Sequence, residues 1–385
     1  MKILAIETSC DETALALLEI RGGLNNLRLK VKKSVVASQI KLHAKYGGVV
    51  PNLAKREHIR NLPILLKRIG LANSSNSKPP PSPRLRWASK TKNLKVEENW
   101  KKINLIAVTV GPGLEPALWT GIQFAKELAK KWKKPLVGAN HLDGHLYSFL
   151  LSSGAKNYKE LLPSINLVVS GGHTILAELK NLKAYRKLGE TCDDAIGESF
   201  DKVARLLNLP YPGGPALEKL AKKGNPQAIP FPSPMISQQN YDFSYSGLKT
   251  SVLYYLKNLG SGVDNFSLSK KEKRVLKDIE SRQNTQADIA ASFQRAAFNA
   301  LVKKSIRAAQ EFGARTITIG GGVAANKMLP KMIKMGLKKI GLEIKVIVPP
   351  LKYCMDNAVM IGLAAYISGL RKKSYKLRAE GNLNI

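Results

Sequence analysis

A pattern of strand, polar turn and strand occurs twice in this chain and limits what the chain can fold into. Residues 3–19 read ILAIETSCDETALALLE, and residues 167–179 repeat the layout as LVVSGGHTILAEL. In each half a later strand ends in glycines, VTVGPG at 108–113 and ITIGGG at 317–322. Such a repeat predicts two related lobes whose polar turns converge in a cleft. Chance similarity between short strands is the alternative.

Short β-branched runs alternate with helical patterns along the rest of the chain. Strands are expected at 103–110, 136–138, 316–319 and 346–348, and helices at about 121–132, from 142, from 324 and at 356–369. Strands that feed helices through glycine turns are typical of an α/β fold with partly parallel sheets. Two segments interrupt this texture: a Pro/Ser-rich stretch at about 74–99, expected to be an exposed loop, and a charged stretch at about 259–283.

The charge of the chain is strongly unbalanced. Its 62 Lys and Arg residues against 28 Asp and Glu give a formal net charge of +34 over 385 residues. Such a surface favours a nucleic acid or an anionic membrane, unless it only reflects a lysine-rich proteome. No run of about 18 uncharged apolar residues predicts a membrane span. Three cysteines without a CxxC pair point to a reducing compartment, so a cytoplasmic location is expected.

Glycine turns are the first candidates for ligand binding. Ser170, Gly171 and Gly172 join two expected strands, and residues 320–326 (GGGVAAN) join a strand to a helix. Small residues let backbone N–H groups approach phosphate oxygens closely. Glycines before a helix suit a phosphate or a nucleoside. Neither turn has the P-loop or the dinucleotide-binding fingerprint.

A histidine pair is the candidate metal site. His141 and His145 in HLDGH stand four residues apart, so on a helix both imidazoles reach one ion, although such pairs are also common as structural features. The zinc-protease sequence H-E-x-x-H is absent, and a third ligand, naturally an acidic residue, must come from elsewhere. Carboxylates kept near strand ends of this basic chain are further candidates, with helix capping as the alternative: Glu7, Asp11, Glu12, Asp193, Asp194, Glu198, Asp201 and Asp356.

Nine ordered segments together resemble the TsaD family of tRNA N6-adenosine threonylcarbamoyltransferases, formerly named O-sialoglycoprotein endopeptidases. They are ILAIETSCDETA (3–14), SQIKLHAKYGGVVPNLAKREHIRNL (38–62), VTVGPGLEPALWTGIQFAKELA (108–129), NHLDGHLYSFL (140–150), VVSGGHT (168–174), DDAIGESFDKVARLLNLPYPGGPALE (193–218), DFSYSGLKT (242–250), GGGVAANKML (320–329) and CMDNAVMIGLAAY (354–366). HLDGH is similar to the bacterial and organellar branch.

The resemblance implies a fold and a reaction. The fold has two ribonuclease-H-like lobes around a central nucleotide cleft, as in actin, sugar kinases and heat-shock chaperone ATPases. Lobe I would cover 1–160 with a C-terminal helix at 350–385, and lobe II would cover 161–349. The threonylcarbamoyl group of threonylcarbamoyl-AMP would pass to N6 of the adenosine 3′ of the anticodon, in tRNAs that read codons beginning with A. AMP would be released.

The resemblance also assigns residues. A divalent metal, Fe²⁺ in preference to zinc, would be held by His141, His145 and Asp356. The adenylate would contact the turn of Val168, Val169, Ser170, Gly171 and Gly172, together with Asp201, Gly214 and Asn326. Asp11 and Glu12 would lie beside the reacting group, and our hypothesis makes Asp11 the base that takes the N6 proton.

Partners and alternatives complete the prediction. The resemblance implies an inactive paralogue subunit (TsaB-like) and a small ATPase (TsaE-like), with tRNA held through phosphates by Lys and Arg. The main alternative is an ATP-dependent small-molecule kinase on the same fold. A metalloprotease lacks its base, and an inactive scaffold needs no metal ligands.

Overall fold

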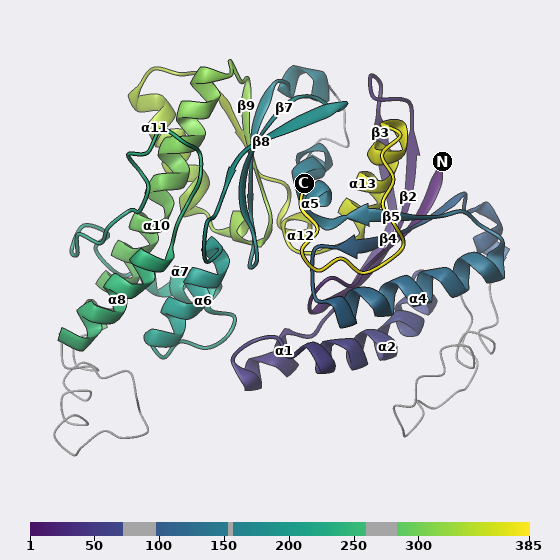
Figure 1. Ribbon diagram of the computed structural model, residues 1–385, viewed down its shortest axis with the longest axis horizontal. Helices are drawn as coiled ribbons and strands as arrows, with labels where there is room; N and C mark the ends of the chain where they lie inside the picture. The colour runs from purple at the N-terminus through teal and green to yellow at the C-terminus, as the bar shows by residue number, and fades with distance from the viewer. Residues whose placement is uncertain (72–97, 153–156, 259–282) are drawn as a thin grey trace. The chain divides into compact units, whose positions relative to one another are not determined.

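The computed structural model describes residues 1–71, 98–152, 157–258 and 283–385 (Figure 1). The chain forms two compact units. Unit 1 comprises Met1–Glu160, Asn181–Lys183 and Pro349–Ile385, and unit 2 comprises Leu161–Lys180 and Ala184–Val348. The segments predicted at about 74–99 and 259–283 lie outside the described residues, apart from their last positions.

A five-stranded mixed sheet forms the centre of unit 1. Its strands are β1 (Lys2–Glu7), β2 (Glu12–Arg21), β3 (Arg28–Ser38), β4 (Leu105–Gly111) and β5 (Leu136–Asn140). The strand order is β3-β2-β1-β4-β5. The first three strands form an antiparallel meander, whereas β4 and β5 run parallel to β1 because helices connect them.

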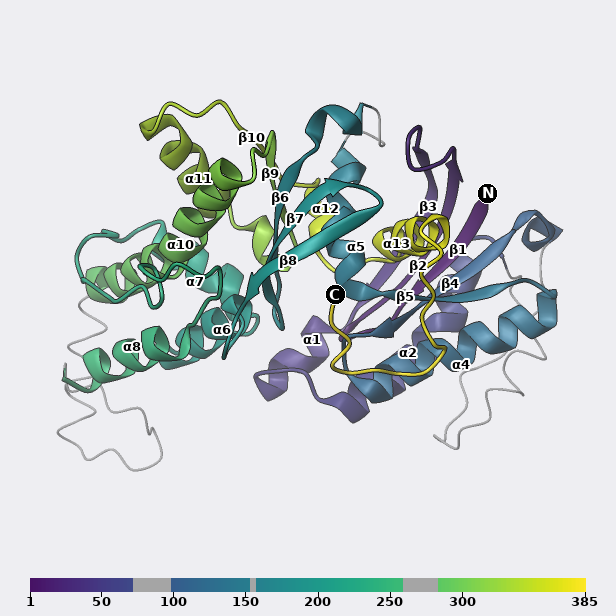
Figure 2. The ribbon, with the colours of Figure 1, turned by 45° about the horizontal axis from the view of Figure 1, so that its top comes forward.

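Helices cover both faces of this sheet, as Figures 1 and 2 show. Unit 1 contains α1 (Ile40–His43), α2 (Pro51–Arg68), α4 (Glu115–Trp132), α5 (His141–Tyr147), α12 (Leu351–Cys354) and α13 (Ala358–Leu370), with 3-10 helices η1 (Ala44–Tyr46), η2 (Glu98–Lys102) and η3 (Ser148–Ser152). Alternating residues of the strands face opposite layers. Leu4 and Ile6 pack with α2 and α4, whereas Ala5 faces α13.

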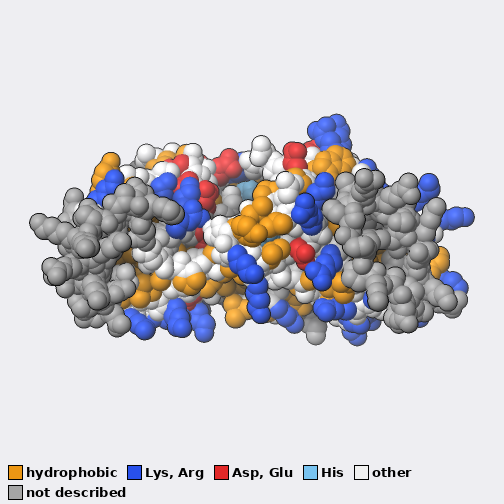
Figure 3. Space-filling model, turned by 90° about the horizontal axis from the view of Figure 1, so that it is seen from below, with side chains coloured by type: hydrophobic (Ala, Val, Ile, Leu, Met, Phe, Trp, Pro, Cys, Tyr) orange, Lys and Arg blue, Asp and Glu red, His pale blue; other side chains and the backbone are white. Residues whose placement is uncertain are grey.

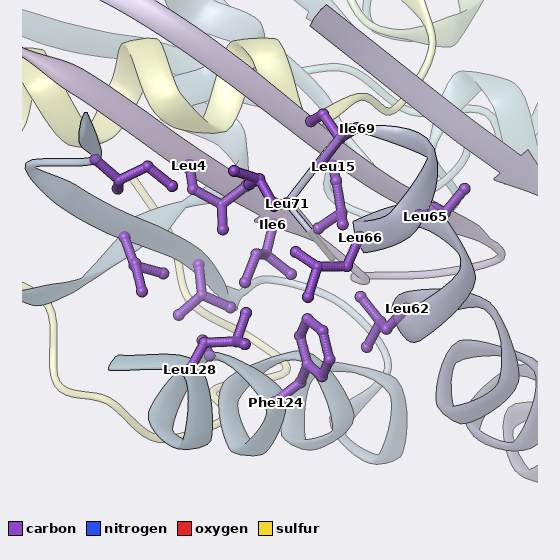
Figure 4. Packing of buried hydrophobic residues seen from close by; sticks show 14 of the residues in the cluster. Leu4, Ile6, Leu15, Leu62, Leu65, Leu66, Ile69, Leu71, Phe124 and Leu128 are labelled. Atoms are coloured by element: carbon purple, nitrogen blue, oxygen red, sulfur yellow. The ribbon is translucent and has the colours of Figure 1, made fainter. Parts of the chain in front are cut away.

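The main core of unit 1 lies between the sheet and helices α2 and α4 (Figure 4). Leu62, Leu65 and Leu66 of α2 and Phe124 of α4 are fully buried there. Burial of each such side chain contributes about 1.5–3 kcal/mol. This packing fixes β1 and β4, and therefore the loops that leave their carboxyl ends.

The last residues of the chain return to this unit instead of extending the final helix. The predicted C-terminal helix at 350–385 is wrong beyond Leu370, where α13 ends. The segment from 371 to 385 runs in extended and turn conformations alongside β5 and β4 (Figure 2). Its Leu377 and Leu383 pack against the core, and the Glu380 N–H donates to the Val110 carbonyl at 2.8 Å.

Unit 2 repeats the sheet of unit 1. Its strands are β6 (Ser164–Val169), β7 (Thr174–Asn181), β8 (Ala184–Glu190), β9 (Thr316–Gly320) and β10 (Lys345–Ile347), in the order β10-β9-β6-β7-β8. β6 pairs antiparallel with β7 and parallel with β9, as β1 does with β2 and β4. The predicted duplication and α/β class are therefore confirmed.

The long helix α10 (Gln283–Glu311) is the centre of the helical layer of unit 2. It contacts α7 (Gly213–Ala221), α8 (Ser246–Asn258) and α11 (Met328–Lys339), and α6 (Ile196–Leu206) packs on α7 and α8. Phe200 of α6 meets Phe293 and Phe298 of α10 with ring centroids 5.1 and 5.5 Å apart. Two 3-10 helices complete the described elements: η4 (Tyr158–Leu161) and η5 (Gly322–Ala325).

Within the described residues, no helix combines the length and the apolar character needed to cross a membrane.

Candidate active site

Helix α5 carries the predicted histidine pair. β5 ends at Asn140, whose side-chain oxygen accepts a hydrogen bond from the Leu142 N–H at 2.7 Å and caps the helix. His141 and His145 stand one turn apart and lie on the same face of α5. Both are buried, and their Nε2 atoms are 3.1 Å apart. The spacing therefore brings the imidazoles together as predicted.

Asp356 approaches the same point from the other end of the chain. The following residue, Asn357, accepts from the Met360 N–H at 3.1 Å and caps α13, so Asp356 stands just before the helix. The sequence pattern had placed Asp356 at the start of the helix. Its Oδ1 lies 3.2 Å from Nε2 of His145 and 3.4 Å from Nε2 of His141.

These three atoms have the spacing of ligands around one metal ion. Ligands about 2.1 Å from an ion stand about 3.0 Å apart at right angles and about 3.4 Å apart in a tetrahedron. The observed separations of 3.1–3.4 Å fall in this range. Two imidazoles and one carboxylate suit iron or zinc and leave positions open for a substrate. The residues therefore fit a metal ion.

Glu7 orients His141 from the side opposite the other ligands. Its Oε2 lies 3.2 Å from Nδ1 of His141 and also accepts from the Thr109 hydroxyl at 2.5 Å. The carboxylate is fully buried at the end of β1. A proton on Nδ1 leaves Nε2 free to bind a metal, the usual arrangement of ligating histidines. Glu7 was predicted only as one of many retained carboxylates, and its position after a buried strand was the available signal.

The charges of this cluster shift the pKa values of its members. Burial by itself lowers the pKa of His141, but the carboxylates of Asp356 and Glu7 outweigh it and raise the value to about 10. Burial by itself raises the pKa of Asp356, but the two histidines hold it well below its ordinary range. Burial lowers the pKa of His145. Negative charge thus dominates the cluster, which favours a cation.

Asp11 lies in the loop between β1 and β2, Glu12 is the first residue of β2, and both are 7% exposed. Their side chains are hydrogen-bonded to each other, and the Ser38 hydroxyl donates to Glu12 at 3.3 Å. Burial, together with the charges of Asp11 and Asp356, raises the pKa of Glu12 to about 10. Glu12 therefore holds a proton at neutral pH.

His58 of α2 supports this loop from beneath. Its Nε2 donates to the Cys10 carbonyl at 2.9 Å, and its Nδ1 accepts from the Thr13 hydroxyl at 2.8 Å. Burial lowers the pKa of His58, in agreement with a neutral ring that donates at one nitrogen and accepts at the other. His58 lies in the segment 38–62 that resembles the TsaD family, and the sequence assigned it no role.

In unit 2 the predicted glycine turns leave neighbouring parallel strands at the same edge. β6 leads into Ser170, Gly171 and Gly172, and β9 leads into Gly321. Gly321 has φ +92°, and a Cβ there would lie 2.3 Å from the Val169 carbonyl oxygen, so only glycine allows this approach. Gly171 and Gly172 are exposed, with nothing within 4 Å of an added Cβ. Ligands of α/β proteins bind at such strand ends.

The two valines that precede the turn have only their backbone groups available to a ligand. The side chains of Val168 and Val169 are buried in the sheet. The Ser170 hydroxyl accepts from the His173 N–H at 3.1 Å and closes the turn. The amino end of α6 meets the turn where the Gly197 N–H donates to the Ser170 carbonyl at 3.2 Å.

The remaining predicted nucleotide contacts cap helices in this structure. Asp201 Oδ1 accepts from the N–H groups of Gly213 and Gly214, at 2.8 and 3.2 Å, at the start of α7. Burial raises the pKa of Asp201. Asn326 accepts from Met328 at 2.9 Å at the start of α11, and its amide donates to Gln294 at 2.7 Å. The structure thus brings the predicted residues together as two groups, one in each unit.

Comparisons with known proteins identify the family of the chain. A family model described as TsaD: tRNA N6-adenosine threonylcarbamoyltransferase matches residues 30–77 and 91–363. A protein of that name from Moorella thermoacetica is 42% identical over 96% of this chain and 92% of its own length. Another from Thermosipho melanesiensis is 42% identical over the whole of both chains. This chain belongs to the TsaD family.

Membership agrees with the resemblance inferred from the motifs. The relatives bear the name of a tRNA-modifying transferase, and none of those cited is a kinase. Among solved structures, HypF of T. kodakarensis aligns with a TM-score of 0.46 and 16% identity, over 96% of this chain and 48% of that protein. The fold of this TsaD-family chain is established by its repeated strand order.

Proposed function

We propose that this chain transfers the threonylcarbamoyl group of threonylcarbamoyl-AMP to N6 of adenosine in tRNA. The observation that carries the proposal is the triad of His141, His145 and Asp356 at ligand spacing, in a chain 42% identical over its length to transferases of this name. The substrate adenosine is the one 3′ of the anticodon in tRNAs that read codons beginning with A.

The proposed reaction is an acyl transfer. The N6 amine attacks the carbamoyl carbonyl carbon, a C–N bond forms, and the bond from that carbon to the phosphate oxygen breaks as AMP leaves. N6 loses one proton. Asp11 takes it, because its partner Glu12 already holds a proton with a pKa raised to about 10.

The metal site belongs to the same proposal. His141, His145 and Asp356 would hold a divalent metal, iron in preference to zinc, and that metal would supply Lewis-acid chemistry. Glu7 keeps the Nδ1 proton of His141 in place.

The nucleotide end of the substrate is proposed to bind unit 2. The exposed turn of Ser170, Gly171 and Gly172 offers backbone N–H groups to the phosphate as it becomes a leaving group. Val168 and Val169 contribute backbone, and Asp201, Gly214 and Asn326 contact the nucleoside.

The basic surface is proposed to hold tRNA. Lys and Arg side chains are spread over the face displayed in Figure 3, where few Asp and Glu side chains are seen. A net charge of +34 favours a polyanion. A TsaB-like paralogue and a TsaE-like ATPase are the proposed helpers, in the cytoplasm.

A single-turnover assay tests the proposal. The protein, with its metal content recorded, is mixed with threonylcarbamoyl-AMP and unmodified tRNA, and digested nucleosides are read by mass spectrometry. Threonylcarbamoyladenosine is expected from the wild type and not from His141→Ala. His43→Gln is the matched control, because His43 is a buried histidine outside the triad. No product even with both helper subunits added contradicts the proposal.

A further inference from the structure

Helix α5 presents a second stripe of residues besides the metal ligands. Asp143 and Tyr147 are also four residues apart, and they are displaced by two positions from His141 and His145. Two residues turn an α-helix by about 200°, so this stripe lies on the side of α5 away from the ligands. Both residues are fully buried. The contacts of this stripe therefore bear on how the ligand stripe is placed.

The segment after α13, residues 371–385 and called here the C-terminal tail, covers this second stripe. The Tyr375 hydroxyl donates to Asp143 Oδ2 at 2.6 Å, and Lys373 Nζ lies 3.9 Å from the same oxygen. Arg371 donates to the Tyr147 hydroxyl at 2.6 Å. All three tail residues lie within the first five residues after α13.

A fourth tail contact reaches the start of the helix. Asn140 caps α5 through its side-chain oxygen, and its side-chain nitrogen donates to the Asn384 carbonyl at 3.1 Å. A buried carboxylate such as Asp143 is costly unless it is hydrogen-bonded or paired. The tail supplies such partners to Asp143 and also holds the residue that begins the helix.

The two ligating histidines differ in how they are oriented. His141 is hydrogen-bonded through Nδ1 to Glu7. Nδ1 of His145 is buried and has no hydrogen-bond partner among the described residues. Apart from the contacts of its Nε2 with Asp356 and His141, the ring of His145 takes its position from the backbone of α5 and from packing. Contacts that hold helix α5 in position therefore also hold the His145 side chain in position.

We propose that the C-terminal tail positions α5 for metal binding, with Tyr375 and Asp143 as positioning residues. The inference rests on the proposed metal site of His141, His145 and Asp356. Neither residue touches the ion. Loss of the Tyr375 hydroxyl removes none of the three ligand residues. It weakens the contact that holds α5, the helix that carries two of them. Substitution of residues that support metal ligands typically lowers metal affinity 10- to 100-fold. We expect Tyr375→Phe to lower it about tenfold.

The test compares two hydroxyl deletions in the whole chain. Tyr375→Phe removes the bond to Asp143. Tyr366→Phe, the matched control, removes a bond of the same 2.6 Å length from α13 to the Gly22 carbonyl, away from α5. The Zn²⁺ affinity of the metal-free protein is measured by competition with a chromophoric chelator, and stability is measured by urea unfolding with chelator present.

The expected result is weaker Zn²⁺ binding in Tyr375→Phe alone. Tyr375→Phe should also lose more stability than Tyr366→Phe, because it removes a donor from the buried Asp143 carboxylate, whereas Tyr366 donates to an exposed backbone carbonyl. In an Asp143→Asn background the Tyr375→Phe change should add little further effect, since the two residues act through one bond. Equal affinities of Tyr375→Phe and wild type overturn the inference and leave the metal site standing. A wild type that does not bind Zn²⁺ at this site overturns the proposed metal site and the inference with it.

Discussion

Replacement of Glu7 by glutamine is the most direct test of how the orientation and the protonated nitrogen of His141 are fixed. Glu7 Oε1 accepts from the Ser9 N–H at 2.5 Å, while Oε2 faces the Thr109 hydroxyl and Nδ1 of His141. In Glu7→Gln the amide oxygen has to serve Ser9, which turns the NH₂ group toward His141. Two donors then face each other.

The conflict is relieved if His141 gives up its Nδ1 proton and keeps a proton on Nε2, the atom that would bind the metal. We therefore expect metal affinity to fall about 10- to 100-fold, about 1.4–2.7 kcal/mol. The loss of a buried charge also lowers the pKa of His141, because Glu7 is one of the two carboxylates that raise it.

The assay is a Zn²⁺ titration of the metal-free protein against a chromophoric chelator near neutral pH. Glu19→Gln is the matched control, since Glu19 lies on the neighbouring strand β2 and pairs with Arg21 and Lys32 away from the triad. Glu7→Gln with wild-type affinity would refute the role of Glu7 as the partner that fixes His141.

Three further predictions concern other parts of the chain. Gly321→Ala is expected to destabilise the protein by about 2–5 kcal/mol in urea unfolding through strain and overpacking, against about 1–2 for Gly313→Ala, where φ is +59° and nothing lies within 4 Å of the added Cβ. The pKa of Glu12 is raised in the folded state, from 4.5 to about 10, so its contribution to stability is lost as pH rises through this window. Glu12→Gln should therefore stabilise the chelator-treated protein more at about pH 8 than at about pH 5, and an equal effect at both would contradict the shift. The logarithm of tRNA affinity should fall linearly with the logarithm of salt concentration, with a slope of about 0.7–0.9 per phosphate contact in a filter-binding series; a flat line would exclude the phosphate contacts.

The fold was predictable because its signal is periodic and occurs twice. The two strand-turn-strand patterns are β1–β2 and β6–β7, and the glycine-ended strands are β4 and β9. Boundaries were less accurate where local signals conflicted. α4 begins at Glu115 rather than near Gly121, because Pro116 reads as a turn residue but is tolerated in the first turn of a helix. The sequence of the non-helical C-terminal tail has neither a helical nor a strand periodicity from which its course could be predicted.

The candidate site was predictable to the extent that its residues are neighbours in sequence. His141 and His145 lie one helical turn apart, so spacing alone placed them together. Asp356 lies 211 residues from His145. The residues alone offered it as one of eight candidate carboxylates, and the family resemblance singled it out as the third ligand. The contacts of Asp143 and Tyr375 depend on tertiary packing, which has no local pattern to detect.

A metal ion at the triad would explain why a chain with few carboxylates places four of them around His141 and His145. Glu7, Asp11, Glu12 and Asp356 are at most partly exposed, and they crowd two histidines in unit 1. Without a cation the Glu12 carboxylate opposes folding in this arrangement, as its raised pKa indicates. A divalent ion at the triad reverses the balance, since binding to the folded state stabilises it by RT ln(1 + [M]/Kd). Metal affinity and folding stability are therefore coupled through the same carboxylates, and substitutions that favour the empty fold should weaken the metal site.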